Sequence, residues 1–145
     1  MHALSFLAVL ASALFAGAAL YATLVEHPAR LHCGPPMALA QFRMSYPRGA
    51  RLQAPLAVVA CLAAAGAWLA GGPWGWLPAG AAVGAVVPYT LVAIMPTNRR
   101  LLDPALDPDV PEVRSLLRRW GQLHLVRTAL GLVATWWMLR LLSAG

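Results

Sequence analysis

The sequence predicts an all-α integral membrane protein folded as a four-helix bundle. Of its 145 residues, 60% are hydrophobic and only 11% are charged, against about 25% charged residues in ordinary soluble domains. The apolar residues form four blocks with nearly all the charged residues between them, whereas a soluble protein would spread its charges over every helix surface. The length allows one domain, residues 1–145, and we expect its helices at about residues 3–26, 54–71, 77–96 and 112–142.

The first block runs from Ala3 to Val25 without a charged residue. At 1.5 Å per residue, a helix of this length extends over roughly 34 Å and crosses a hydrocarbon core of about 30 Å. No Lys or Arg precedes the block, and it is longer than the apolar core of a signal peptide, about 7–15 residues. These features favour a membrane helix over a cleaved signal sequence.

The second and third blocks are shorter and contain prolines. We place Pro55 in the first turn of the second helix, where a missing N–H costs nothing. Pro88 lies inside the third block and should kink that helix. Trp74 and Trp76, between the two blocks, are typical of an aromatic belt at a membrane interface.

Small residues recur at a spacing of four, which lets helix backbones approach closely in lipid. We therefore expect helix contacts at three pairs, namely Gly80 with Gly84, Ala60 with Ala64, and Ala13 with Gly17.

The fourth block has one polar face. Its residues recur at spacings of three and four and so fall along one stripe, and they are Trp120, His124, Arg127, Thr128, Gly131 and Thr135. The other faces carry Leu125, Val126, Leu130, Leu132 and Val133, which suit lipid or packing. We expect the polar stripe to face the bundle interior, because an arginine at mid-membrane costs about 2.5–3.5 kcal/mol without a partner.

The orientation follows from the arginines, which make up all 11 basic residues. The segment between the second and third helices has none, whereas the other two connections hold Arg30, Arg43, Arg48 and Arg51, and Arg99, Arg100, Arg114, Arg118 and Arg119. The positive-inside rule places both of these connections in the cytoplasm and both termini outside. We expect an integral protein of a bacterial inner membrane. Its net charge of +6 is explained by this anchoring and requires no nucleic-acid partner.

The two Arg-rich connections differ in character. Residues 28–53 are rich in proline but too apolar for a disordered linker, and we expect them to form a lid or a re-entrant segment over the bundle. Residues 99–112 contain two Asp-Pro pairs and resemble a turn-rich connector. Cys33 falls in the first connection and Cys61 in a membrane helix, so no structural disulfide is expected.

Three polar clusters adjoin the cytoplasmic ends of apolar blocks. They are Glu26-His27-Pro28, Pro96-Thr97-Asn98 and the segment from Trp120 to Arg127. Because the topology puts all three on one side, we expect a single cavity surrounded by Glu26, His27, Asn98, His124 and Arg127. Two simpler interpretations remain open, in which Arg127 reaches lipid phosphates and His124 is a packing histidine.

The same residues carry a resemblance to a known family. The pattern comprises Tyr21-x4-Glu26-His27-Pro28, Tyr46-Pro47 with Gln53-Ala54-Pro55, Met95-Pro96-Thr97-Asn98, and Trp120-x3-His124-x2-Arg127-Thr128. It resembles the anthrone-oxygenase-like family of small four-helix membrane proteins. The resemblance implies O2-dependent conversion of anthrones to anthraquinones, with Tyr21, Tyr46 and Trp120 as substrate-binding residues. Residues 29–45 match the family poorly and leave the substrate open.

A mechanism can be assigned to these residues. A neutral histidine is suited to remove the acidic C–H proton of an anthrone; we favour His124 as this base, with His27 second. Arg127 and Asn98 would stabilise the oxyanion, and Glu26 would orient a histidine or neutralise Arg127. The expected partners are the lipid bilayer and a lipophilic small molecule, and the oligomeric state is left open.

Other classes of function remain alternatives. His27, His124 and Glu26 could supply two histidines and a carboxylate to iron, or with His32 a copper site, although a cofactor-free reaction is favoured. A metal- or haem-linked membrane protein and a small transporter or accessory subunit are the competing interpretations.

Overall fold

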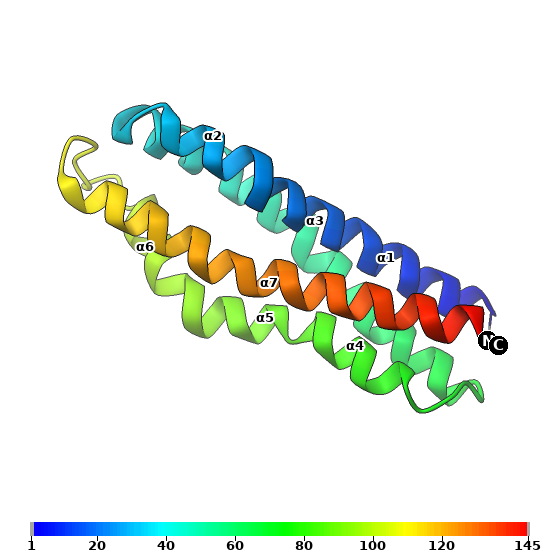
Figure 1. The fold of residues 1–145 in the computed structure, drawn as a ribbon. Helices are drawn as coiled ribbons and strands as arrows, with labels where there is room; N and C mark the ends of the chain where they lie inside the picture. Colours follow the sequence, from blue (N-terminus) through cyan, green and yellow to red (C-terminus); the bar gives the residue numbers. More distant parts are fainter. Residues whose placement is uncertain (1, 145) are drawn as a thin grey trace.

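The computed structural model describes residues 2–144 and consists of four long helical segments (Figure 1). The first comprises α1 (His2–Tyr21), the π-helical turn η1 (Ala22–Glu26) and α2 (His27–His32), and the second is α3 (Pro35–Leu69). The third comprises α4 (Trp76–Gly84), α5 (Val86–Tyr89), η2 (Thr90–Ile94) and α6 (Met95–Leu102), and the fourth is α7 (Pro111–Ser143). All four are long and apolar enough to cross a membrane, as the sequence predicts.

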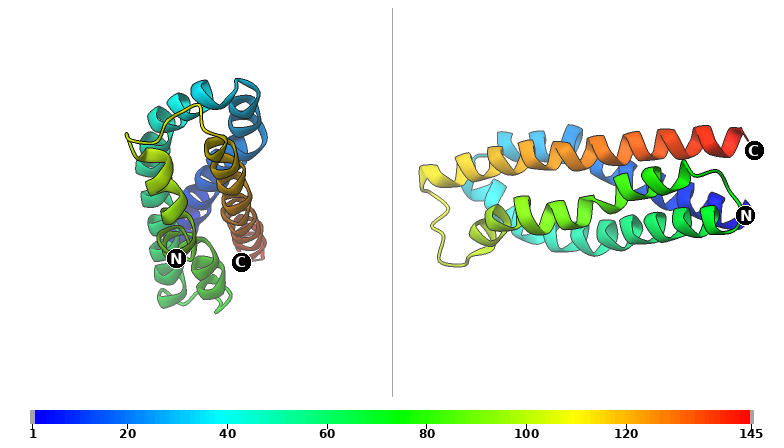
Figure 2. Two further views of the ribbon diagram at one scale, coloured as in Figure 1. Left: turned by 90° about the vertical axis from the view of Figure 1, so that its left-hand side faces the viewer. Right: turned by 90° about the horizontal axis from the view of Figure 1, so that it is seen from below.

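The segments form an elongated antiparallel bundle (Figures 1 and 2). Both α1 and α4 pack against α3 and α7. The N- and C-termini lie together at one end, and the connections 33–34 and 103–110 lie at the other, which we call the connection end. Residues 33–34 and 103–110 contain no arginine, and the arginines of the two predicted connections lie in the parts of the helices that lead to this end.

The predicted lid is instead a helix. Residues 35–53 form the first half of α3, joined to the first segment only by Cys33 and Gly34. Gly34 adopts φ 80°, which favours glycine, and prolines suit the first turn that follows. Pro47 and Pro55 lie inside α3 and not at its start. Interior prolines are tolerated in membrane helices because neighbouring groups satisfy the freed carbonyls, so proline content misplaced this boundary.

Two helical segments change their winding just before a proline. In η1 the N–H of His27 reaches the carbonyl of Ala22, and in η2 the N–H of Met95 reaches that of Thr90. Pro28 and Pro96 follow directly, and a proline ring clashes with the carbonyl four residues earlier in a regular helix. The wider π-helical turn accommodates that clash, and such turns are frequent at functional sites. Pro88, where the sequence predicts a kink, lies inside α5, and the helix is interrupted three residues earlier, at Ala85 between α4 and α5.

The small residues make close contacts at some predicted positions only. A Cβ added to Gly80 would lie 2.8 Å from Ala64 Cβ, and one added to Gly84 would lie 2.8 Å from Cys61 Sγ, so α4 packs tightly on α3. In contrast, Ala13 is exposed and a Cβ at Gly17 would meet nothing within 4 Å.

The two tryptophans assigned to an aromatic belt differ in their exposure. Trp74 is exposed, but Trp76 is buried in the core.

Gly131 allows α7 to approach α1. A Cβ there would lie 2.8 Å from the ring of Phe15. We expect Gly131→Ala to lower the free energy of unfolding by about 1–3 kcal/mol, because overpacking displaces a buried ring. Thermal unfolding in detergent would measure this, with Gly17→Ala as the matched control that should not lower stability. Equal stability of the two variants would contradict the close approach.

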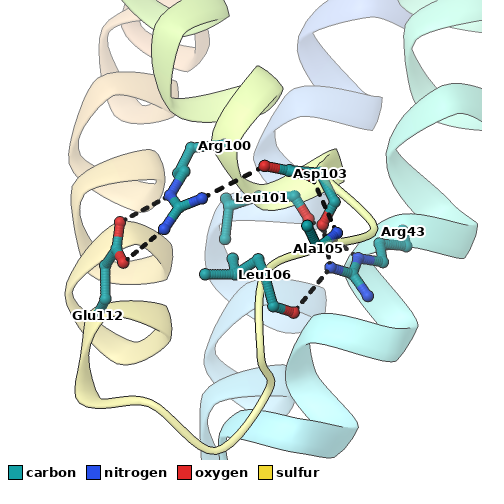
Figure 3. Close-up of polar contacts among 7 residues, drawn as sticks. All are labelled: Arg43, Arg100, Leu101, Asp103, Ala105, Leu106 and Glu112. Atoms are coloured by element: carbon teal, nitrogen blue, oxygen red, sulfur yellow. Dashed lines mark hydrogen bonds and ion pairs between the residues drawn. The ribbon is translucent and has the colours of Figure 1, made fainter.

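Charged side chains fix the connection between α6 and α7 (Figure 3). Arg43 donates to the carbonyls of Leu101 (3.1 Å) and Asp103 (2.6 Å). Arg100 bridges both carboxylate oxygens of Glu112, each at 2.9 Å. The Asp103 side chain accepts from the N–H of Ala105 at 2.9 Å, the turn that an Asp-Pro pair predicts. This connection therefore holds α3, α6 and α7 together at their ends.

A polar layer divides the core of the bundle. Toward the termini the core contains Phe15, Trp76 and Met138 with many alanines. Toward the connection end it contains Leu39, Phe42, Leu101, Val113 and Leu117. The polar stripe of α7 crosses between these two apolar clusters, and the residues described next lie there.

Candidate functional site

The polar stripe of α7 faces the bundle interior. Trp120, His124, Arg127 and Thr128 are all buried, and Arg127 lies at the midpoint of α7 with 7% of its surface exposed. On the other faces Leu125, Val126, Leu132 and Val133 are exposed. The helical spacing thus predicts correctly which face turns inward, and Arg127 does not extend to the surface as it would to reach lipid phosphates.

The stripe borders a small central cavity of about 40 Å³. The first helical segment, α3 and α7 all contribute side chains to it. Its lining residues include Glu26, Arg30, Ser45, Tyr46, Gln53, Trp120, His124 and Arg127. Of the predicted site residues, the structure therefore brings Glu26, Tyr46, Trp120, His124 and Arg127 to one space.

Threonines from two helices orient His124. Its Nδ1 lies 3.1 Å from Thr23 Oγ1, which lies 2.8 Å from Thr128 Oγ1. The Thr128 hydroxyl lies 3.3 Å from two carbonyls, those of Ala19 and His124, which can only accept. In one consistent assignment Thr128 donates to one of these carbonyls, Thr23 donates to Thr128, and His124 Nδ1–H donates to Thr23. This tautomer leaves a lone pair on Nε2, as a general base requires.

Trp120 lies between the two histidines. Its ring stacks on His124 with centroids 4.6 Å apart and meets His27 at 5.0 Å. His27 fits because position 121 is glycine, since a Cβ there would lie 2.6 Å from His27 Nε2. His27 does not line the central cavity but a separate groove of about 350 Å³ between the first helical segment and α7. The geometry therefore favours His124 over His27 as the residue facing the site.

The partner of Glu26 differs from the prediction. Its carboxylate accepts from Arg30 Nη2 and from Gln41 Nε2, each at 2.8 Å, and Arg30 also donates to Gln41 and Ser45. Arg30 is buried over the rings of Phe42 (5.3 Å) and Trp120 (5.6 Å). Glu26 thus neutralises Arg30 on its own helical segment and forms no ion pair with Arg127.

Arg127 has no carboxylate partner among residues 2–144. Its Nη2 donates to Gln53 Oε1 at 3.0 Å, and its guanidinium lies 5.7 Å from the centre of the Phe15 ring. Its Nε is buried without a hydrogen-bond partner, and the ion pairs of the described chain involve only Arg30 and Arg100. A buried charge is costly without compensation. The cavity beside His124 therefore offers a binding site for an anionic oxygen.

Asn98 and Tyr21 lie outside the central cavity. Asn98 is fully buried and donates its Nδ2 to the hydroxyl oxygen of Tyr46 at 2.7 Å, so it supports Tyr46 from behind. Tyr21 is 58% exposed and lines an outer groove of about 300 Å³, beyond the Glu26–Arg30 pair. Sequence position gave neither location, because both depend on the rotation of the helices.

The alternative metal site is not assembled. Trp120 stands between His27 and His124, and Glu26 is engaged by Arg30. His32 is exposed and bonds to the carbonyl of Pro28 on its own helix. Within residues 2–144 no group of three His, Cys, Asp or Glu side chains lies close enough to hold a metal ion.

Several site residues were missed from the sequence. Arg30, Gln41, Ser45 and Phe42 were assigned to a connection, and Thr23 was passed over as an apolar-block residue. The sequence does contain a signal for two of them, Gln41 and Ser45. Together with Gly49 and Gln53 they recur at a spacing of four and so share one face of a helix. That face of α3 meets Glu26, Arg30 and Arg127.

Comparison with known proteins gives the family. The family model described as anthrone oxygenase matches residues 42–136. The anthrone oxygenase gedH of Aspergillus terreus (strain NIH 2624 / FGSC A1156) is 37% identical over 100 residues, which cover 62% of this chain and 65% of that relative. No solved structure matches the chain. The family match covers more than half of the sequence and includes Tyr46, Asn98, Trp120, His124 and Arg127, and the chain therefore belongs to the anthrone oxygenase family.

Proposed function

We propose that this protein is a membrane-embedded oxygenase that converts a lipophilic, anthrone-like aromatic and O2 into the corresponding quinone. The observation that carries the proposal is the buried Arg127, which has no carboxylate partner and borders the same cavity as His124. A base beside an unpaired cation suits a substrate that becomes an oxyanion when it loses a C–H proton. The family match and the anthrone oxygenase gedH support the same reaction class.

The reaction can be written with this chain's own residues. His124 Nε2 takes the proton from the methylene carbon opposite the ketone, and the electron pair of that bond delocalises onto the ketone oxygen. Arg127 stabilises this oxyanion, with Tyr46 beside it on the cavity wall. The carbanion then transfers electrons to O2 and a C–O bond forms, and the peroxide anion takes back the proton held by His124 to give a hydroperoxide. Loss of the second C–H proton and cleavage of the O–O bond release water and leave the quinone carbonyl.

The remaining residues position these groups. Thr23 and Thr128 hold the His124 tautomer, Asn98 holds Tyr46, and the Glu26–Arg30 pair closes one side of the cavity. The lipid bilayer supplies the apolar substrate, and the proposal includes no nucleic-acid partner.

Oxygen uptake tests the proposal. Purified protein in lipid nanodiscs should accelerate O2 consumption with an anthrone, forming one quinone for each O2, and activity should persist after exhaustive chelation. Uptake no faster than the spontaneous oxidation would refute the oxygenase. Activity that is lost on chelation and returns with iron or copper would overturn the cofactor-free mechanism and assign the histidines to a metal.

The orientation of the bundle is tested separately. We propose that the connection end faces the cytoplasm, because nine of the 11 arginines lie in the parts of the helices that lead to it. In a Cys33→Ser background, Trp74→Cys should react with an impermeant maleimide on intact cells. Ala105→Cys should react only after permeabilisation, and the reverse result would invert the topology. Both positions are exposed.

A further inference from the structure

An apolar groove of about 150 Å³ lies between α3 and the α5–η2 segment. Small side chains on α3, Ala50 and Ala54, leave the space open, and Arg127 is the one charged residue among those lining it. The Thr90 hydroxyl donates to the Val86 carbonyl of its own helix at 2.6 Å and so presents no free donor. The groove is thus an apolar surface that ends at the Arg127 guanidinium and the Tyr46 hydroxyl.

The groove and the central cavity meet. Tyr46 and Arg127 line both. The central cavity, at about 40 Å³, has room for only a few water-sized molecules, since each occupies at least about 10–15 Å³ on this measure. It can hold O2 or the edge of a ring beside His124, but not a fused ring system. Most of an aromatic substrate must therefore lie outside it.

The groove opens onto the lipid-facing surface. Leu91, which lines it, is 59% exposed, and the neighbouring Val92 is 79% exposed. A membrane-dissolved molecule can thus reach the groove sideways without crossing water. Thr90 and Leu91, which line the groove, belong to the π-helical turn η2.

The other two grooves suit an anionic ring less well. The groove at Tyr21 meets the central cavity at Glu26 and Arg30, which form an ion pair and so leave no unpaired cation there for the oxyanion. The groove at His27 is lined by the polar side chains of Thr23, Arg118 and Gln122, and it meets the central cavity at Trp120 and His124 and not at Arg127. Charge complementarity therefore selects the groove that ends at Arg127.

We propose that the groove between α3 and the α5–η2 segment binds the fused ring system of the substrate, which enters from the bilayer with its oxyanion directed to Arg127. The substrate class is then a flat polycyclic phenol without a sugar or a carrier thioester, because the side-chain donors lining the groove, Tyr46 and Arg127, both lie where it meets the central cavity. This inference rests on the oxygenase activity proposed above. The inference adds that a preceding reaction must release the aromatic substrate from any carrier to which a thioester joins it.

Filling the groove tests the inference. Ala54→Trp should raise the KM for anthrone roughly tenfold or more, a loss of at least about 1.4 kcal/mol in binding, with the wild-type fold retained in thermal unfolding. The matched control is Ala81→Trp on α4, an exposed alanine outside the described cavities, which should leave kcat and KM unchanged. An active wild type with an unaffected Ala54→Trp variant refutes the groove. An inactive wild type refutes the oxygenase proposal instead.

A second measurement does not depend on turnover. Photolysis of benzophenone, a diaryl ketone, in vesicles containing the protein should attach it to residues 46–54 and 86–95, and excess anthraquinone should suppress this labelling. Competed labelling at Leu31 or Gln122 would assign the ring system to the groove at His27 and overturn the inference.

Discussion

Replacing Arg127 by glutamine should lower kcat by about 10²–10³, the effect of removing one preorganised oxyanion donor. The physical reason is that Arg127 is the buried cation without a carboxylate at the central cavity. Glutamine keeps much of the side-chain volume and can still bond to Gln53, but it cannot supply charge. The measurement is steady-state O2 uptake with an anthrone, together with the rate of quinone formation.

Stability separates the catalytic role of Arg127 from a structural one. Removing an unpaired buried charge relieves a desolvation cost, so Arg127→Gln should unfold at the same temperature as the wild type or higher. Arg127→Lys should also be impaired, because a point charge cannot replace a planar fork of donors. The matched control is Arg140→Gln, an exposed arginine on the same helix. Full activity in Arg127→Gln would rule out an oxyanion role.

Replacing His124 by glutamine should lower kcat by about 10²–10⁴, because a positioned base contributes that much. An amide fills most of the imidazole's space beside Trp120 but cannot accept a proton at this step. The deficit in kcat relative to wild type should shrink as the pH rises, because hydroxide can then remove the C–H proton of the bound substrate in place of His124. Deuterium at that carbon should slow the wild type and show that proton removal limits the rate.

The control for His124 is another histidine of the same chain. His32→Gln changes an exposed side chain that bonds to the carbonyl of Pro28, and it should retain wild-type activity. A deficit in His124→Gln that stays the same at every pH and accompanies a lower unfolding temperature would identify His124 as a packing residue.

How far the sequence predicts this fold depends on whether the signal is local. The inward face of α7 follows from residue spacing alone, because helical periodicity fixes which side chains share a face. The four membrane-length segments follow from the apolar blocks in the same way. The proline-rich composition of residues 28–53, however, predicts a connection where the chain forms helix, because the tolerance of prolines in a bundle depends on neighbours that a single sequence does not show.

The same error in the helix boundaries prevented a prediction of the Glu26–Arg30 pair. Glu26 and Arg30 are four residues apart, a spacing that pairs them only if the helix continues through Pro28. With Arg30 assigned to a connection, Glu26 was available as the partner of Arg127. The observed pairing leaves Arg127 unpaired, which is the feature that most favours an anionic substrate.

The two π-helical turns have a consequence for how the family can vary. A turn of this kind holds one residue more than a regular turn, and the helix beyond it continues as it would after a regular turn. Deleting one residue from 22–26 would therefore restore a regular turn and keep Arg30 beside Phe42 and Trp120. Pro28 would then meet the carbonyl four residues before it, the clash that the wider turn accommodates. Active relatives that lack one residue in 22–26 or 90–94 should therefore also lack the proline that follows.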